Sequence, residues 1–219
     1  MPGARHRCQP RYVLTNLTRC VPGAGGRRAP RSLVSEANAI VIRVTDHDEL
    51  LIRVAERAMR QTGGDLSCAT PEQVKEAEAV LGFALPPLLA RLYREVGNGG
   101  FGPDHQFLPL IGSEGRTVVS AYREEQTPGQ WPTGVLPVLD WGCGMYAAVD
   151  CTDAEAPVLL FEPNAVDDDW SHAWFQDADS LADWLRTWLA DAGWYVEEAM
   201  DSDDFSGPQP WSQAERRLA

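Results

Sequence analysis

Apolar residues recur at helical spacing in several segments of the chain, and prolines and glycines mark where these segments begin and end. The clearest segment runs from Leu85 to Gly100, where Pro86 and Pro87 suit the first helical positions because a missing N–H costs little there. One apolar stripe follows, made of Leu88, Leu89, Leu92, Tyr93 and Val96. The run Gly97-Asn98-Gly99-Gly100 then ends the helix, since glycine and asparagine tolerate the left-handed conformation.

A second helix is predicted just upstream, from Pro71 to Leu81. Thr70 is a good N-cap and Gln73 completes a capping box with it. Gly82 ends this helix, and only three residues separate it from Leu85. Two short amphipathic helices joined so closely are expected to pack as a helical hairpin.

Three further helices are expected along the chain. The first begins at Asp46, has an acidic first turn and extends to about Gln61, before a pair of glycines. A short one lies within residues 114–123. The last follows the capping residues Asp177, Asp179 and Ser180, and its wide apolar stripe is made of Leu181, Trp184, Leu185, Trp188, Leu189 and Ala192.

Short β-type runs lie between these last two helices. They are Val135–Trp141, Met145–Asp150, Val158–Glu162 and His172–Phe175, with a hairpin turn at residues 142–144. Residues 106–111 also read as a strand, and Pro109 places it at a sheet edge. The order of elements predicts an α+β fold, in which N-terminal helices and a C-terminal helix pack on a mostly antiparallel sheet.

The motifs of the helical region also resemble a known superfamily. The run from Glu76 to Pro87, followed by Tyr93 and Asn98-Gly99-Gly100, is similar to SUKH proteins, as is the later run from Leu136 to Gly144 with its Val149-Asp150-Cys151 continuation. The resemblance covers about residues 71–192. It implies the same α+β arrangement and a protein-binding role, either as a bacterial immunity protein or as a regulator of the fungal Smi/Knr cell-wall type.

Charge is unevenly distributed along the chain. Residues 1–43 hold eight arginines and one acidic residue, whereas residues 150–219 hold three basic and seventeen acidic residues, within a net charge of −13. We expect residues 1–43 to be a disordered basic arm, with an over-extended translation start as the alternative, residues 44–199 to be a single SUKH-like domain, and residues 200–219 to be an acidic disordered tail. An acidic body repels nucleic acid, so the arm alone could bind it.

Candidate catalytic and metal-binding groups are sparse. His47, His105 and His172 are far apart, and the five cysteines form no C-x-x-C pair, which argues against a zinc site and a disulfide framework. The acidic run 167–169 lacks the ligand spacing of an EF-hand loop. We therefore expect no enzyme activity, no cofactor and no metal, although a hydrolase using the aspartate-rich loops is a third alternative.

A partner-binding site is expected at the ends of the strands. Acidic residues there would attract a basic protein, and tryptophans would anchor it, although these tryptophans could equally cover the end of the sheet. The candidate residues are Asp140, Trp141, Asp150, Glu162, Asp167, Asp168, Asp169 and Trp170. The expected partner is a cognate toxin, of nuclease or deaminase type, or another basic protein domain. With neither a membrane helix nor a secretory leader, the cytoplasm is the expected compartment.

Overall fold

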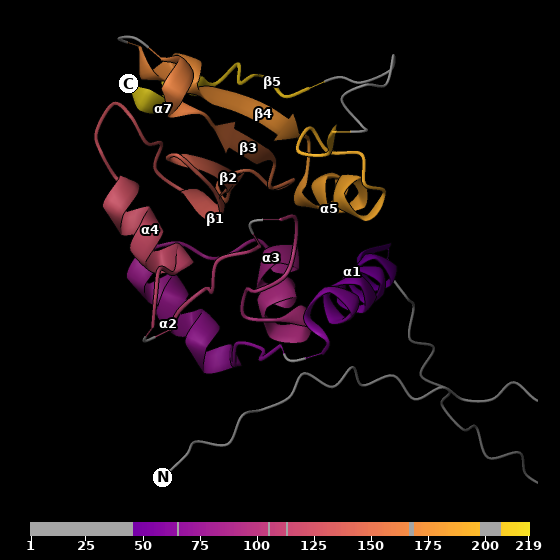
Figure 1. Cartoon of the computed structure of the whole chain (residues 1–219). Coiled ribbons are helices and arrows are strands. Elements are labelled where there is room, and N and C mark those ends of the chain that lie inside the picture. Colours follow the sequence, from indigo (N-terminus) through magenta and orange to yellow (C-terminus); the bar gives the residue numbers. More distant parts are fainter. Residues whose placement is uncertain (1–45, 65, 105, 113, 167–168, 198–206) are drawn as a thin grey trace, which may run out of the picture.

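The computed structural model describes residues 46–64, 66–104, 106–112, 114–166, 169–197 and 207–219 of the chain. Residues 1–45 and 198–206, which include the predicted basic arm and part of the predicted tail, lie outside the described residues. The elements form an α+β fold with a five-stranded antiparallel sheet, as the hydrophobic pattern predicts (Figure 1).

The N-terminal helices begin and end close to the predicted residues. They are α1 (Asp46–Thr62), α2 (Pro71–Leu81) and α3 (Pro87–Arg91), which continues directly as the π-helical turn η1 (Leu92–Val96). The capping box of α2 forms as expected between Thr70 and Gln73, and Gly82 ends the helix in the left-handed conformation. The main packing partners differ from the expected helical hairpin, because α2 packs chiefly on α4 (Val118–Glu125) and η1 packs on α1.

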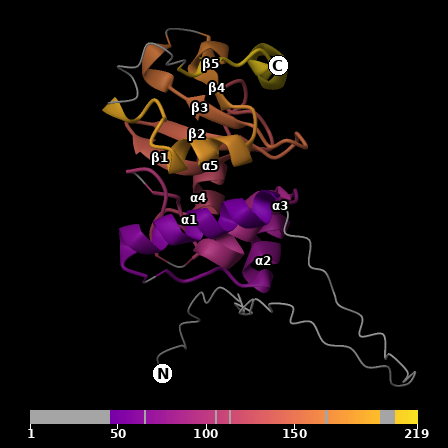
Figure 2. The ribbon, with the colours of Figure 1, turned by 90° about the vertical axis from the view of Figure 1, so that its right-hand side faces the viewer.

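The sheet follows sequence order from edge to edge. Its strands are β1 (Val135–Gly142), β2 (Met145–Asp150), β3 (Val158–Phe161), β4 (Trp174–Ala178) and β5 (Gln209–Pro210). The fifth helix, α5 (Leu181–Leu189), has Ser180 as its N-cap and packs on α1 and β4. Figure 2 shows α5 between the sheet and α1, so this helix joins the helical layer to the sheet.

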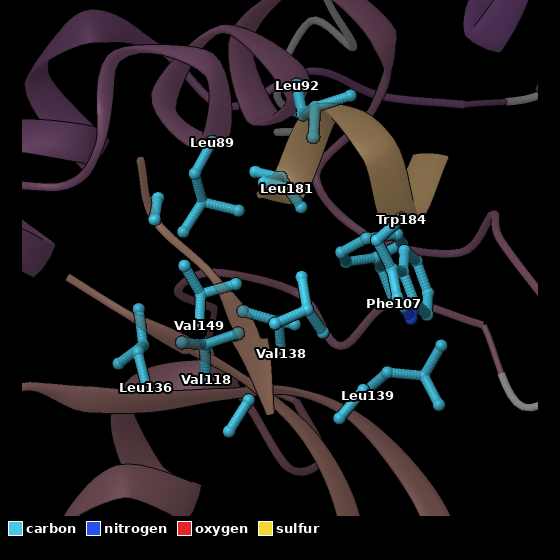
Figure 3. Packing of buried hydrophobic residues seen from close by; sticks show 14 of the residues in the cluster. Leu89, Leu92, Phe107, Val118, Leu136, Val138, Leu139, Val149, Leu181 and Trp184 are labelled. Carbon is cyan, nitrogen blue, oxygen red and sulfur yellow. The ribbon is translucent and has the colours of Figure 1, made fainter. Parts of the chain in front are cut away.

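The main core lies between the sheet and the helices. Leu89 and Leu92 from α3 and η1 face Leu181 from α5 and Val149 from β2, and all four are buried (Figure 3). Emptying such a site by truncating a leucine typically costs about 2–5 kcal/mol. The stripes read from the sequence are therefore the surfaces that hold the helices on the sheet, except at Ala192, which lies beyond the end of α5 and is exposed.

Aromatic side chains form a second buried cluster. Tyr146, Phe161 and Trp174 are neighbours across β2, β3 and β4, so they share one side of the sheet. Trp131, from the loop before β1, packs edge-on to all three at centroid distances of 4.8–5.7 Å. This loop therefore contributes a core residue.

The segment predicted as an edge strand at residues 106–111 forms only one isolated bridge, between Phe107 and Leu139. Its backbone is used elsewhere, because the N–H of Leu110 donates to Oδ1 of Asn98 and the Asn98 amide donates to the carbonyl of Ile111. Gly99 has a φ of +78°, and a Cβ there would lie 2.6–2.7 Å from backbone atoms of residues 107–109. The Asn98-Gly99 pair thus fixes the path of this segment, and the N–H of Leu108 donates to the carbonyl oxygen of Val138 on β1.

Two C-terminal expectations also differ from the structure. The strand expected at His172–Phe175 is shifted, because the 3₁₀ turn η3 (Trp170–Ala173) precedes β4. Residues 207–219 are not a disordered tail: they form β5 and the short helix α7 (Ala214–Leu218). Trp211 between them is buried against Trp174. This apolar contact orders the segment, although the acidic composition of the tail predicts disorder.

Candidate functional site

A tight turn sets the geometry of the candidate site. Cys143 and Gly144 connect β1 to β2 with φ values of 52° and 81°, which is the pattern of a type I′ hairpin turn. The turn places Asp140 opposite Tyr146, and the register continues to Phe161 on β3 and Trp174 on β4.

This register brings several predicted residues to one end of the sheet. Asp140 and Trp141 lie at the end of β1, Glu162 follows β3, and Asp169 with Trp170 precedes β4. We call this region the hairpin end. Asp167 and Asp168 lie outside the described residues.

Side chains tie the loops of the hairpin end together. The Nδ2 of Asn164 donates to the carbonyl oxygen of Cys143 at 3.1 Å, and Glu162 accepts from the backbone N–H of Asn164 at 2.7 Å. Asp169 accepts from the N–H of Ser171, and its hydrogen bonds with Ser171 lower the pKa of the carboxyl. Asp169 therefore remains negatively charged over the physiological pH range.

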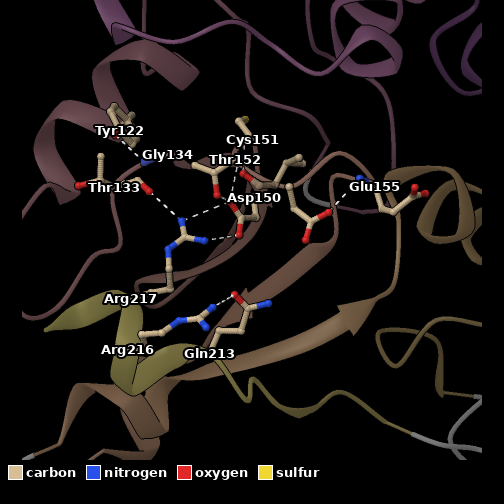
Figure 4. Close-up of polar contacts among 12 residues, drawn as sticks. Tyr122, Thr133, Gly134, Asp150, Cys151, Thr152, Glu155, Gln213, Arg216 and Arg217 are labelled. Carbon is tan, nitrogen blue, oxygen red and sulfur yellow. Dashed lines mark hydrogen bonds and ion pairs between the residues drawn. The ribbon is translucent and has the colours of Figure 1, made fainter.

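Asp150 does not belong to the hairpin end. It lies at the opposite end of β2, pairs in register with Val135 and is 1% exposed. Nη1 of Arg217, from α7, lies 2.7 Å from its Oδ2, and Thr152 donates to its Oδ1 (Figure 4). The expectation that Asp150 shares a surface with the other candidates is therefore wrong.

Arg116 organises the exposed charges at the hairpin end. Its guanidinium contacts three carboxylates, at 3.2 Å to Asp140 and 3.0 Å to both Glu124 and Glu125. It also lies 5.2 Å over the ring of Tyr146, whose hydroxyl donates to Glu125 at 2.9 Å. Burial and the neighbouring Glu125 raise the pKa of Tyr146, so the phenol stays protonated and keeps donating.

The charges around Arg116 do not cancel. Three carboxylates share one guanidinium, which leaves two excess negative charges, and Glu162 and Asp169 add two more at the same end. The Glu124 side chain is 59% exposed, so its carboxylate is open to a partner. The hairpin end is thus an acidic surface built on a rigid turn.

The two tryptophans of the predicted site belong partly to the core. Trp141 stacks on Tyr195 with centroids 4.9 Å apart and contacts Trp194 at 5.1 Å. Trp170 stacks on Phe161 at 6.3 Å. Both are half-buried, so they cover the sheet while keeping part of each ring exposed.

Sequence reasoning missed Arg116, Glu124 and Glu125 as members of this site. Their position on and before α4 carries no sign of proximity to β1, because the fold alone brings α4 beside β1. A weak signal was present, since a lone arginine at position 116 precedes a helix that ends in two glutamates.

The described part of the chain offers little for metal or membrane chemistry. No group of three or more His, Cys, Asp or Glu side chains in it is arranged to hold a metal ion. None of its helices has the length and hydropathy needed to cross a bilayer. Cys143 and Cys151 are free thiols.

Comparison with known proteins identifies one family. The model of the SMI1/KNR4 family (SUKH-1) matches residues 68–187, which is more than half of the chain. The match spans α2 to most of α5 and includes the whole hairpin end, whereas α1, β5 and α7 lie outside it. No curated protein matches the chain.

Proposed function

Because the chain belongs to the SMI1/KNR4 (SUKH-1) family, we propose that it is a non-enzymatic protein-binding module that acts as an immunity protein. Its partner would be a cognate toxin of the nuclease or nucleic-acid deaminase type. Such toxins carry a basic surface for the nucleic-acid backbone, and an acidic protein can cover that surface.

The observation that carries this proposal is the excess of carboxylates at the hairpin end. Glu124, Glu125 and Asp140 are held by Arg116 and Tyr146 in one arrangement, so little side-chain entropy remains to be lost on binding. A lysine or arginine of the partner would find ordered acceptors there.

Two physical terms would set the affinity. The negative field would speed encounter with a basic surface, so association should slow as salt rises. The half-buried ring of Trp170 beside this surface would supply apolar contact and slow dissociation.

A second candidate is a regulatory scaffold of the Smi/Knr cell-wall-regulator type. The observation in its favour is the matched family itself, which carries the SMI1/KNR4 name. A scaffold would bind proteins of its own cell, whereas an immunity protein would bind a toxin encoded beside it, so the identity of the bound protein separates the two.

The test is co-expression of the full chain with the toxin domain encoded next to its gene. The wild-type chain should restore growth and co-purify with the toxin. The double variant Glu124→Gln/Glu162→Gln should associate about threefold to tenfold more slowly at low salt, because it removes two charges from the hairpin end. The control Glu76→Gln/Glu155→Gln removes two exposed charges elsewhere and should associate at the wild-type rate.

The outcomes separate the two parts of the proposal. Failure of the wild-type chain to bind the toxin or restore growth would refute the immunity function. Binding with equal association rates for both variants would keep the immunity function and remove the hairpin end from the interface. Thermal melting of all variants checks that they fold.

A further inference from the structure

A cleft lined by arginines lies between α1 and the C-terminal end of α5. Its volume is about 460 Å³, which is within the range of small-molecule sites, roughly 300–1,000 Å³. Figure 1 places α1 and α4 on opposite sides of the molecule, so this cleft is separate from the hairpin end.

Arg57 is the fixed group at the centre of this cleft. Its Nη1 donates to the carbonyl oxygen of Trp188 at 2.5 Å, and its Nη2 forms an ion pair with Asp191. The guanidinium also lies 4.7 Å over the indole of Trp188 and the side chain is 20% exposed. These bonds use two of the five N–H groups, so the remaining donors are positioned before any ligand arrives.

Arg53 and Arg60 flank Arg57 on the same face of α1. The spacing i, i+4 and i+7 places the three guanidinium groups in one row beside the cleft. Arg53 and Arg60 are exposed, and neither has an ion-pair partner among the residues that the structure describes.

The local charge is opposite to that of the whole chain. The cleft has three arginines against two acidic residues, Glu56 and Asp191, and Asp191 is already paired with Arg57. The chain as a whole has a net charge of −13. Glu56 lies three positions after Arg53 and four before Arg60 and offsets part of the repulsion within the row, but the lining keeps one positive charge in excess, which a bound anion would neutralise.

We propose that this cleft binds a phosphate-bearing small molecule through Arg53, Arg57 and Arg60. Guanidinium groups pair with phosphate through parallel hydrogen bonds. A phosphate monoester offers three terminal oxygens and close to two negative charges, whereas a carboxylate offers two oxygens and one charge. Three neighbouring guanidinium groups in one row therefore match phosphate better. Because α1 lies outside the matched residues 68–187, this site would be an addition to the family domain and does not depend on the proposed immunity function.

The test is calorimetric titration of the full chain with pyrophosphate, and with citrate as the carboxylate probe, at about 0.15 M salt, where nonspecific attraction is largely screened. Pyrophosphate should bind saturably and at least about tenfold more tightly than citrate. The variant Arg53→Gln/Arg60→Gln should lose at least about tenfold in pyrophosphate affinity. The matched control Arg94→Gln/Arg123→Gln removes two exposed arginines elsewhere and should change affinity less than about twofold.

Each remaining result overturns the proposal. Absence of saturable pyrophosphate binding would show that the arginines serve the helix or the surface alone. Equal affinity for citrate would exclude phosphate as the recognised group. Equal loss in both double variants would show attraction to overall charge. Melting curves of both variants, compared with the wild-type chain, ensure that a loss of affinity is not a loss of fold.

Discussion

The ion pair between Arg217 and Asp150 leads to a quantitative prediction about the C-terminal segment. The Asp150 side chain is 2% exposed and sits at the end of β2, whereas Arg217 comes from α7 and is 19% exposed. Nη1 of Arg217 lies 2.7 Å from Oδ2 of Asp150, and its Nη2 lies 3.3 Å from Oδ1 and 2.9 Å from the carbonyl of Thr133. We propose Arg217→Met as the perturbation, because methionine keeps part of the apolar stem.

The magnitude follows from what the carboxylate would lose. Thr152 still donates to Oδ1 through its backbone N–H and its hydroxyl, at 3.0 and 2.7 Å, whereas Oδ2 would lose the charged partner at 2.7 Å. Removing one member of a buried pair typically costs about 3–5 kcal/mol. Since Arg217 is partly exposed, water can replace some of the lost interaction, so we expect a loss of about 2–4 kcal/mol in unfolding free energy.

The assay is urea unfolding followed by tryptophan fluorescence, arranged as a double-mutant cycle. Asp150→Asn in the Arg217→Met background should recover part of the loss, because an amide leaves no unpaired charge. The neighbouring Arg216→Met is the control: Arg216 is exposed and donates to the Gln213 side chain, so its loss should stay within about 0.5 kcal/mol.

Two results would refute this reasoning. A loss below about 0.5 kcal/mol for Arg217→Met would mean that Asp150 is solvated and that α7 does not pack as described. If Arg217→Met loses the expected stability and the double variant recovers none of it, the loss comes from packing over Trp211, which lies 5.5 Å from the guanidinium, and not from the unpaired charge.

Two further predictions concern the core. Burial raises the pKa of Asp177 above its ordinary value of 3.8, although the indole N–H groups of Trp184 and Trp194 oppose the shift. Between the unfolded and the folded pKa, the folded chain therefore holds a proton on Asp177 that the unfolded chain has released. The free energy of unfolding falls as pH rises through this interval. Asp177→Asn keeps an acceptor oxygen and should lack this fall. If the urea midpoints of the wild-type chain and the variant change with pH in the same way from about pH 4 to pH 7, the prediction is wrong. Leu92→Ala and Trp188→Ala should each cost about 2–5 kcal/mol in urea unfolding, and a loss under about 1 kcal/mol would contradict their burial.

The helices show how much of this fold is predictable from local sequence. The start of α2 at Pro71, its capping box and its end at Gly82 are all as predicted, because each signal acts within one or two turns. The hairpin turn at residues 142–144 is likewise local, since three successive residues with positive φ and short flanking strands suffice. The hydrophobic stripes then predict the α+β class, because each stripe needs a surface to cover it.

Pairings between distant residues were decided by the tertiary structure. The sequence pattern places Asp150 with the acidic strand ends, but the fold brings Arg217 to it across 67 positions and buries it. Arg116 reaches Asp140 because α4 packs beside β1, and no pattern around position 116 encodes that neighbour. Residues 207–219 have only a weak hydrophobic pattern, and they are ordered because Trp211 packs on Trp174.

The difference has one physical cause. Caps, turns and helical stripes lower the free energy of a short segment by themselves, so these elements can be predicted from residues that are close together in the sequence. Burial and ion pairing depend on which surfaces meet after the chain has closed, and a side chain such as that of Asp150 has the same sequence context whether its partner is water or an arginine. The main helices, the β-hairpin and the acidic character of this protein can thus be read from its residues alone, whereas packing of the folded chain selects which charges are buried and which remain available to a partner.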